Sequence, residues 1–130
     1  MNIENFKLLR DHVAANSKFS MNSITHRCGS AACIMGSAEA IILSQTENPR
    51  ISEFTFHDVN GRLRVCSYYI RSKWLDISFA EYDHIYMGNF SIYPSMDQIT
   101  QAEAVAFLDM CIESEHVFLG QVVFVPEEML

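Results

Sequence analysis

The sequence predicts a mainly α-helical fold of the α+β class: a compact bundle of about four to five helices with a small β-hairpin or a two- to three-stranded β element. Two observations lead to this prediction. Apolar residues make up 49% of the chain, and they recur at helical spacing in several segments. Proline and glycine number only three and five, so few segments are interrupted. With 130 residues, the chain is expected to fold as a single domain over residues 1–130.

The first predicted helix covers residues 2–17. Asn2 is a suitable N-cap, because its side chain can accept a hydrogen bond from the first turn, and Glu4 suits the positive end of the helix dipole. Apolar residues at helical spacing define the expected buried face, namely Ile3, Phe6, Leu9 and Val13.

The second predicted helix runs from about Ser30 to Ser44. Small residues recur along one of its faces, at Gly29, Cys33, Gly36 and Ala40. A glycine inside a helix costs about 1 kcal/mol relative to alanine. We therefore interpret this face as one against which another backbone segment packs closely.

Residues 51–65 alternate between apolar and polar side chains around Asn60-Gly61, which predicts a short hairpin. A third helix is expected from about Arg64 to Leu75. Near the other end of the chain, Phe118 to Val125 is rich in β-branched and aromatic residues, so it is predicted to form a strand that could pair with residues 54–56.

Two capping-box patterns predict where the last two helices begin. Ser78 with Glu81 opens a short helix that Gly88 ends, and Thr100 with Glu103 opens a longer helix. This longer helix is expected to reach about Ser114, to bury Ala102, Val105, Leu108 and Ile112, and to expose Glu103, Asp109 and Glu113.

The charge is distributed unevenly. The net charge is −7, yet residues 1–73 carry all nine Lys and Arg, whereas residues 74–130 carry ten acidic residues and no Lys or Arg. Such a block repels nucleic acid and attracts basic surfaces. The alternative is an acidic, solvated face that serves only to keep the protein soluble.

No apolar run long enough for a membrane helix and no secretory signal is present, so a cytoplasmic protein is expected, with cysteines that are not in disulfides.

Reactive side chains converge in one segment, where His26, Cys28 and Cys33 lie close together in the sequence. Cys28 before a helix could be a nucleophile, with His26 or a distant histidine as the base. The three residues could also bind a metal, although zinc sites ordinarily need a second ligand pair. We favour a structural motif of small, buried residues, which consists of Cys28, Gly29, Ser30, Cys33 and Gly36. We expect neither a cofactor nor a metal.

The run Cys-Gly-Ser-Ala-Ala-Cys-Ile-Met-Gly-Ser-Ala at residues 28–38 resembles the Cys-Gly-Thr-x-x-Cys-x-x-Gly-x-Ala motif of small uncharacterised proteins encoded by tailed phages, prophages and their bacterial hosts. Residues 19–21, 74–78 and 99–104 resemble further elements of that family, so the likeness covers residues 2–117. Asp76 replaces a glycine that the family usually carries, and Ser30 replaces a threonine. The resemblance implies a phage accessory protein in the host cytoplasm.

The leading hypothesis is that this protein is not an enzyme and that it binds a host protein with a basic surface, such as a nucleic-acid-binding complex, as a counter-defence or host-takeover inhibitor. Direct nucleic-acid or membrane binding is not expected. The predicted binding residues are Asp76, Glu81, Asp83, Asp109, Glu113 and Glu115, with Tyr82 and Tyr86 as aromatic anchors at the rim. The alternatives are a cysteine-dependent hydrolase or transferase that uses Cys28, and a small metal-binding structural protein.

Overall fold

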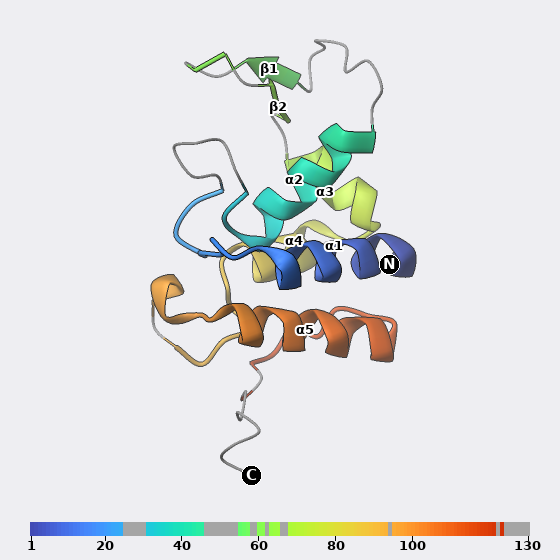
Figure 1. Ribbon diagram of the computed structural model, residues 1–130. Helices are drawn as coiled ribbons and strands as arrows, with labels where there is room; N and C mark the ends of the chain where they lie inside the picture. Colours follow the sequence, from blue (N-terminus) through green and yellow to red (C-terminus); the bar gives the residue numbers. More distant parts are fainter. Residues whose placement is uncertain are drawn as a thin grey trace.

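Helices account for most of the chain in the computed structural model (Figure 1). The structure describes residues 1–24, 31–45, 55–57, 60–61, 63–65, 68–93, 95–121 and 123. Within these ranges it contains five α-helices and one short 3-10 helix: α1 (Ile3–Ala15), α2 (Ile34–Gln45), α3 (Tyr68–Leu75), α4 (Phe79–Tyr86), η1 (Met96–Gln98) and α5 (Gln101–Ser114). The predicted mainly helical class is confirmed.

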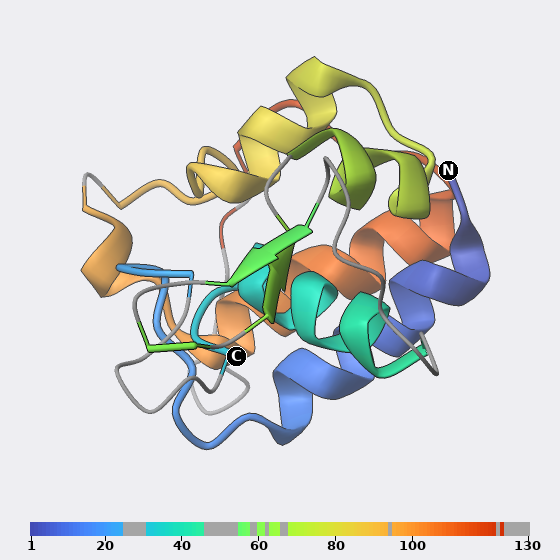
Figure 2. The same cartoon turned by 90° about the horizontal axis from the view of Figure 1, so that it is seen from above.

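Helix α1 forms because its cap and its apolar spacing agree. The Asn2 side chain accepts a hydrogen bond from the backbone N–H of Asn5 at 3.0 Å, as expected of an N-cap. Phe6, Leu9 and Val13 are buried. Figures 1 and 2 show α1 side by side with α5, which runs in the opposite direction.

The end of α1 is held by the beginning of α5. The side-chain amide of Gln101 donates to the carbonyl oxygens of Val13 at 2.6 Å and Asn16 at 2.8 Å. The last carbonyls of a helix lack partners within the helix, so Gln101 satisfies groups that would otherwise need water. On the same pair of helices, Arg10 donates to the Asp109 carboxylate at 2.8 Å.

Helix α2 lies at the centre of the molecule. Its first six residues, from Ile34 to Glu39, are all buried, and the helix contacts α1, α3, α4 and β2. It begins at Ile34 rather than at Ser30. Gly29, Ser30 and the other residues from 25 to 30 lie outside the described residues.

The chain passes unusually close to α2 at Gly36. A Cβ atom built on Gly36 would lie 1.9 Å from the carbonyl oxygen of Ile24. Ile24 is held there because this same oxygen accepts a hydrogen bond from Ala32 N–H at 3.0 Å, and Ser20 N–H donates to the Ala32 carbonyl at 2.9 Å. The close approach of backbone that the small-residue spacing predicts therefore occurs at Gly36.

Two short strands, β1 (Thr55–His57) and β2 (Leu63–Val65), pair in antiparallel fashion, with Phe56 opposite Arg64. The helix predicted from about Arg64 instead begins at Tyr68, because residues 63–65 belong to β2. Several residues of the 51–65 segment lie outside the described part of the chain, so the hairpin as a whole stays a prediction.

Helix α4 begins where its capping box predicts. Ser78 accepts from Glu81 N–H at 3.1 Å, and the Glu81 carboxylate accepts from Ser78 N–H at 2.9 Å. Gly88 follows the helix with a φ of +69°. Asp76, in the turn before α4, has a φ of +54°, which is a conformation that favours glycine.

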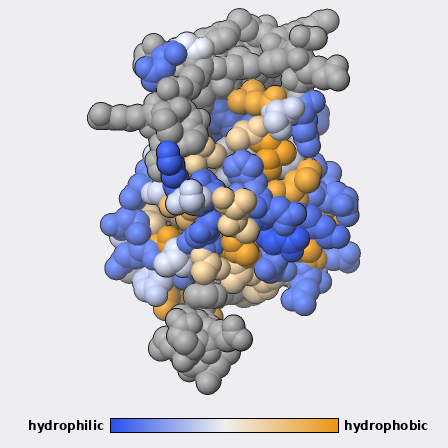
Figure 3. Space-filling view, viewed as in Figure 1, coloured by the Kyte–Doolittle hydropathy of each residue, from blue (hydrophilic) through white to orange (hydrophobic). Residues whose placement is uncertain are grey.

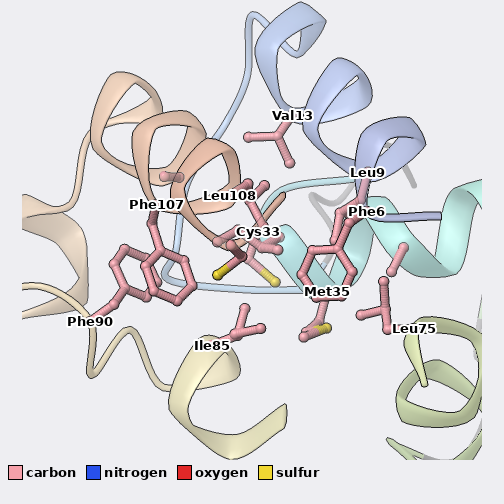
Figure 4. Close-up of a cluster of buried hydrophobic side chains, with 14 of the residues drawn as sticks. Phe6, Leu9, Val13, Cys33, Met35, Leu75, Ile85, Phe90, Phe107 and Leu108 are labelled. Atoms are coloured by element: carbon pink, nitrogen blue, oxygen red, sulfur yellow. The ribbon is translucent and has the colours of Figure 1, made fainter. Parts of the chain in front are cut away.

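Side chains from all five α-helices meet in one core (Figure 4). Phe90, after α4, stacks on Phe107 of α5 with ring centroids 4.3 Å apart.

The predicted inner face of α5 is wrong by about one residue. Of the four residues expected inside, only Leu108 is fully buried, and Glu103, expected outside, is buried together with Ala104, Phe107, Leu108 and Cys111. Both apolar stripes have helical spacing, and packing against α1 and Phe90 decides which of them is buried.

The strand predicted from Phe118 to Val125 is not present in its described residues, which are 118–121 and 123. Two side chains hold this segment against the rest of the fold instead. His84 Nε2 lies 3.0 Å from the Gly120 carbonyl oxygen, and the Gln121 amide donates to the Ser91 carbonyl at 3.2 Å. Each of these contacts joins a side chain to a backbone carbonyl, so neither is the backbone pairing of a strand.

The face seen in Figure 1 is largely hydrophilic, and its apolar side chains gather mainly over the region of α2 and α3 (Figure 3). Among the described residues, none of the helices combines the length and the apolar character that crossing a membrane requires.

Replacing Gly36 with alanine should destabilise the protein by about 1–3 kcal/mol, because the new methyl group would overlap the Ile24 carbonyl. The measurement is equilibrium unfolding in denaturant. Ser37→Ala in the same helix is the control, because the Ser37 hydroxyl is buried without a hydrogen-bond partner among the described residues, so its loss should cost little or nothing. A Gly36→Ala protein as stable as the wild type would contradict the packing constraint.

Candidate functional site

One face of α4 is lined by four residues at helical spacing. Phe79, Tyr82, Asp83 and Tyr86 stand three, four and seven positions apart, so their side chains project from the same side of the helix. Together with Ile24 and Arg71 they line a pocket of about 350 Å³, which we call the α4 pocket. Phe79 is 59% exposed although it is a large apolar side chain, and Asp83 is exposed beside it.

A second hollow adjoins the α4 pocket, because the two share Ile24 and Tyr86. It measures about 270 Å³ and has a different character, since three methionines contribute to its walls. We call it the methionine pocket, and its remaining lining residues are Met21, Asn22, Ser23, Cys33, Met87 and Met96. The two pockets together extend the accessible apolar surface along α4.

Three buried polar side chains are linked at the α4 pocket: Arg71 and Tyr82 line it, and Glu39 lies next to Arg71. Arg71 of α3 donates to the Tyr82 hydroxyl at 2.7 Å, and its guanidinium lies 3.9 Å from the carboxylate of Glu39 in α2. Tyr82 is 4% exposed and Glu39 is 2% exposed. A charge removed from water in this way needs a partner of opposite sign, and Arg71 and Glu39 provide that for each other.

The protonation of Tyr82 follows from this environment. Burial raises the pKa of Tyr82 from the ordinary value of 10.0 to about 12, although the neighbouring Arg71 guanidinium acts in the opposite direction. Burial dominates because the phenolate would have to be stabilised with little access to water. Tyr82 is therefore a neutral hydroxyl at physiological pH, and its ring lies nearly parallel to that of Tyr86 with centroids 5.9 Å apart.

The cysteines that the structure describes are both buried thiols, Cys33 and Cys111. Burial raises the pKa of Cys33, even though its Sγ accepts a hydrogen bond from Gly36 N–H at 3.3 Å. Burial likewise raises the pKa of Cys111 to about 11. Neither thiol has the low pKa of a nucleophile. The candidate nucleophile Cys28 and its candidate base His26 lie outside the described residues.

The structure brings three of the eight predicted binding residues together, since Tyr82, Asp83 and Tyr86 all line the α4 pocket. Tyr82 is buried in the wall and is not a rim residue. Glu113 and Glu115 are exposed at the end of α5, where Glu115 ends the helix with a φ of +59°.

The other three predicted acidic residues have partners within the fold. Glu81 completes the capping box of α4, and Asp109 pairs with Arg10. Asp76 lies 3.3 Å from the N-terminal ammonium group of Met1. Exposed ion pairs such as those of Asp109 and Asp76 contribute little to stability, but they offset the negative charge that these two residues offer to a partner.

Three residues of the pocket did not emerge from the sequence: Phe79, Arg71 and Ile24. Phe79 could have been found, because the capping box fixes where α4 begins and therefore which residues share a face with Tyr82. Arg71 and Ile24 come from other elements, and no local pattern connects them to α4.

No family model, curated protein or solved structure matches this chain. In the part of the chain that the structure describes, no three His, Cys, Asp or Glu side chains are grouped so that they could hold a metal ion.

Alkylation of Cys33 and Cys111 should be slow in the folded protein near neutral pH, because both thiols are buried and have raised pKa values. Peptide mapping after timed treatment with iodoacetamide measures each site, and the unfolded protein gives the unprotected rates. Rapid labelling of either residue would contradict the buried placement. The same digest reports Cys28, and a fast, pH-independent rate there would favour the cysteine-enzyme alternative.

Tyr82 should ionise at a higher pH than an ordinary tyrosine. Its raised pKa means that the stability it contributes is complete below pH 10 and is lost as the pH rises through about 12. A titration that follows phenolate absorbance should show a highest step that is missing in Tyr82→Phe. Loss of a step near pH 10 instead would contradict the burial of Tyr82.

Proposed function

We propose that this protein is a non-enzymatic binding module, and that the α4 face receives a basic surface of a partner protein. The observation that carries this proposal is Phe79. It stands 59% exposed next to the carboxylate of Asp83 at a pocket of about 350 Å³. Interfaces obtain most of their energy from a few side chains that fill such pockets, and aromatic residues and arginine are prominent among them.

Exposed apolar side chains continue along the same side of the molecule. Met87 is 43% exposed directly after α4 and lines the methionine pocket, which adjoins the α4 pocket through Tyr86. Methionine side chains adapt their shape to different neighbours, which suits a contact surface. The apolar area beside α4 is thus larger than one pocket.

The charge around this face supports a basic partner. No Lys or Arg follows Lys73 in the sequence, so α4, η1 and α5 bring only acidic charges to their surfaces. Asp83, Asp97, Glu113 and Glu115 are exposed on these elements. A field of one sign speeds the encounter with a partner of the opposite sign and disfavours nucleic acid itself.

The more specific part of the proposal is that this is a phage accessory protein that inhibits a host protein, as a counter-defence or host-takeover factor acting in the host cytoplasm. Its support is the motif at residues 28–38 and the elements around it. The left-handed conformation of Asp76 is in keeping with that resemblance, because the related element carries glycine at this position. A nucleic-acid-binding host complex is the kind of partner that offers an extended basic groove.

Reversing the charge of Asp83 with Asp83→Lys should weaken capture of the partner from a bacterial lysate by about tenfold, and rising salt should weaken capture by the wild type. Quantitative mass spectrometry of the retained proteins measures both effects.

Glu4→Lys is the matched control, because it makes the same change of charge on α1, which Figure 2 places on another side of the molecule from α4. The proposal fails if Asp83→Lys retains the same proteins as the wild type, or if both variants lose them equally.

A further inference from the structure

We propose that the α4 pocket receives one arginine side chain of the partner, stacked against the aromatic rings of Phe79 and Tyr86 and paired with the carboxylate of Asp83. This inference rests on the proposed function and names the group that anchors the partner. It follows from the size of the pocket, the chemistry of its walls and the balance of charge around it.

The pocket is large enough to admit one long side chain, since its volume is about 350 Å³. Phe79, Tyr82 and Tyr86 supply aromatic walls from a single face of α4. Tyr82 is fixed by its hydrogen bond from Arg71, and Tyr86 stacks on it with an interplanar angle of 13°, so one aromatic wall is already oriented.

The charged side chains at the α4 pocket favour a ligand with a positive charge. Arg71 and Glu39 are opposite charges that lie 3.9 Å apart in the interior, so together they add no net charge. Among the described residues, Asp83 is the charged side chain of the pocket lining that is left once Arg71 is paired with Glu39, so these residues together carry a net negative charge. An anionic ligand would be repelled by Asp83, and an apolar side chain would cover this carboxylate without giving it a partner.

Among cationic side chains, the walls favour arginine over lysine. A guanidinium group is planar, so it can lie flat on an aromatic ring while its edge donates two hydrogen bonds to a carboxylate. Phe79, Asp83 and Tyr86 present this combination, since the two rings flank the acidic residue at helical spacing on α4. A lysine ammonium is more strongly hydrated and cannot stack in this way.

The test uses four small probes: the N-acetyl amides of arginine, lysine, citrulline and phenylalanine. Citrulline has nearly the shape of arginine but no charge. Nuclear magnetic resonance titration of the isotope-labelled protein should show the arginine probe shifting the backbone amide signals of α4 and Ile24. We expect citrulline and phenylalanine to bind at least about tenfold more weakly than arginine, and lysine to bind with intermediate affinity.

Variants connect this binding to the pocket. Asp83→Asn should weaken arginine binding by about tenfold, and Phe79→Leu should weaken it by a smaller factor, because leucine keeps the apolar contact but lacks the ring. Both residues are exposed, so both variants should fold, and circular dichroism checks this. Asp97→Asn is the matched control, since Asp97 is an exposed acidic residue of η1 that does not line the α4 pocket.

The inference is overturned if citrulline or phenylalanine binds as tightly as arginine, or if Asp83→Asn binds arginine like the wild type. Its failure is distinct from failure of the proposed function. If no probe binds while capture from lysate still depends on Asp83 and on salt, then the pocket assignment is wrong and the α4 face remains the binding surface. If arginine binds as expected but Asp83→Lys leaves capture unchanged, then the pocket is real and the proposed function is wrong.

Discussion

The fold depends on the contact between Gly36 and the backbone of Ile24. Helix α2 is central because its neighbours approach it from several sides, and the segment that ends at Ile24 comes so close that no side chain fits between them. The same contact shapes the candidate site, since Ile24 lines both the α4 pocket and the methionine pocket. Gly36, inside the core, thus determines where Ile24 lies in the walls of the two pockets.

The parts of the fold that depend on neighbouring residues in the sequence could be predicted, and the parts that depend on distant contacts could not. Asn2, Ser78 and Thr100 each cap a helix that begins at the next residue, because a cap acts within one turn. The prediction for the buried face of α5 was wrong, because two overlapping apolar stripes have the same helical spacing. Distant segments that pack against α5, among them α1 and Phe90, determine which stripe is buried. Residues 118–121 resemble a strand in composition, yet contacts with His84 and Ser91 hold them in another form.

The candidate site was predicted only in part, for the same reason. Composition identified the acidic half of the chain and the tyrosines of α4, but it cannot tell which carboxylates are already engaged. Glu81 caps a helix, Asp109 pairs with Arg10, and only Asp83 of the predicted acids lines the α4 pocket. Arg71 in the pocket wall and its buried partner Glu39 are brought there by α3 and α2, which the local pattern around α4 does not reveal.

The central position of α2 has a consequence for how the molecule responds to a ligand. The buried first half of α2, Ile34 to Glu39, is enclosed by α1, α3 and α4, so its amide hydrogens should exchange with solvent only when the whole fold opens. The wall of the α4 pocket is fastened to this helix through Gly36 and through the link from Glu39 to Arg71 and Tyr82. Occupation of the pocket would therefore slow exchange in α2, which contributes no lining residue but packs against the pocket wall, and would raise the stability of the whole cooperative unit.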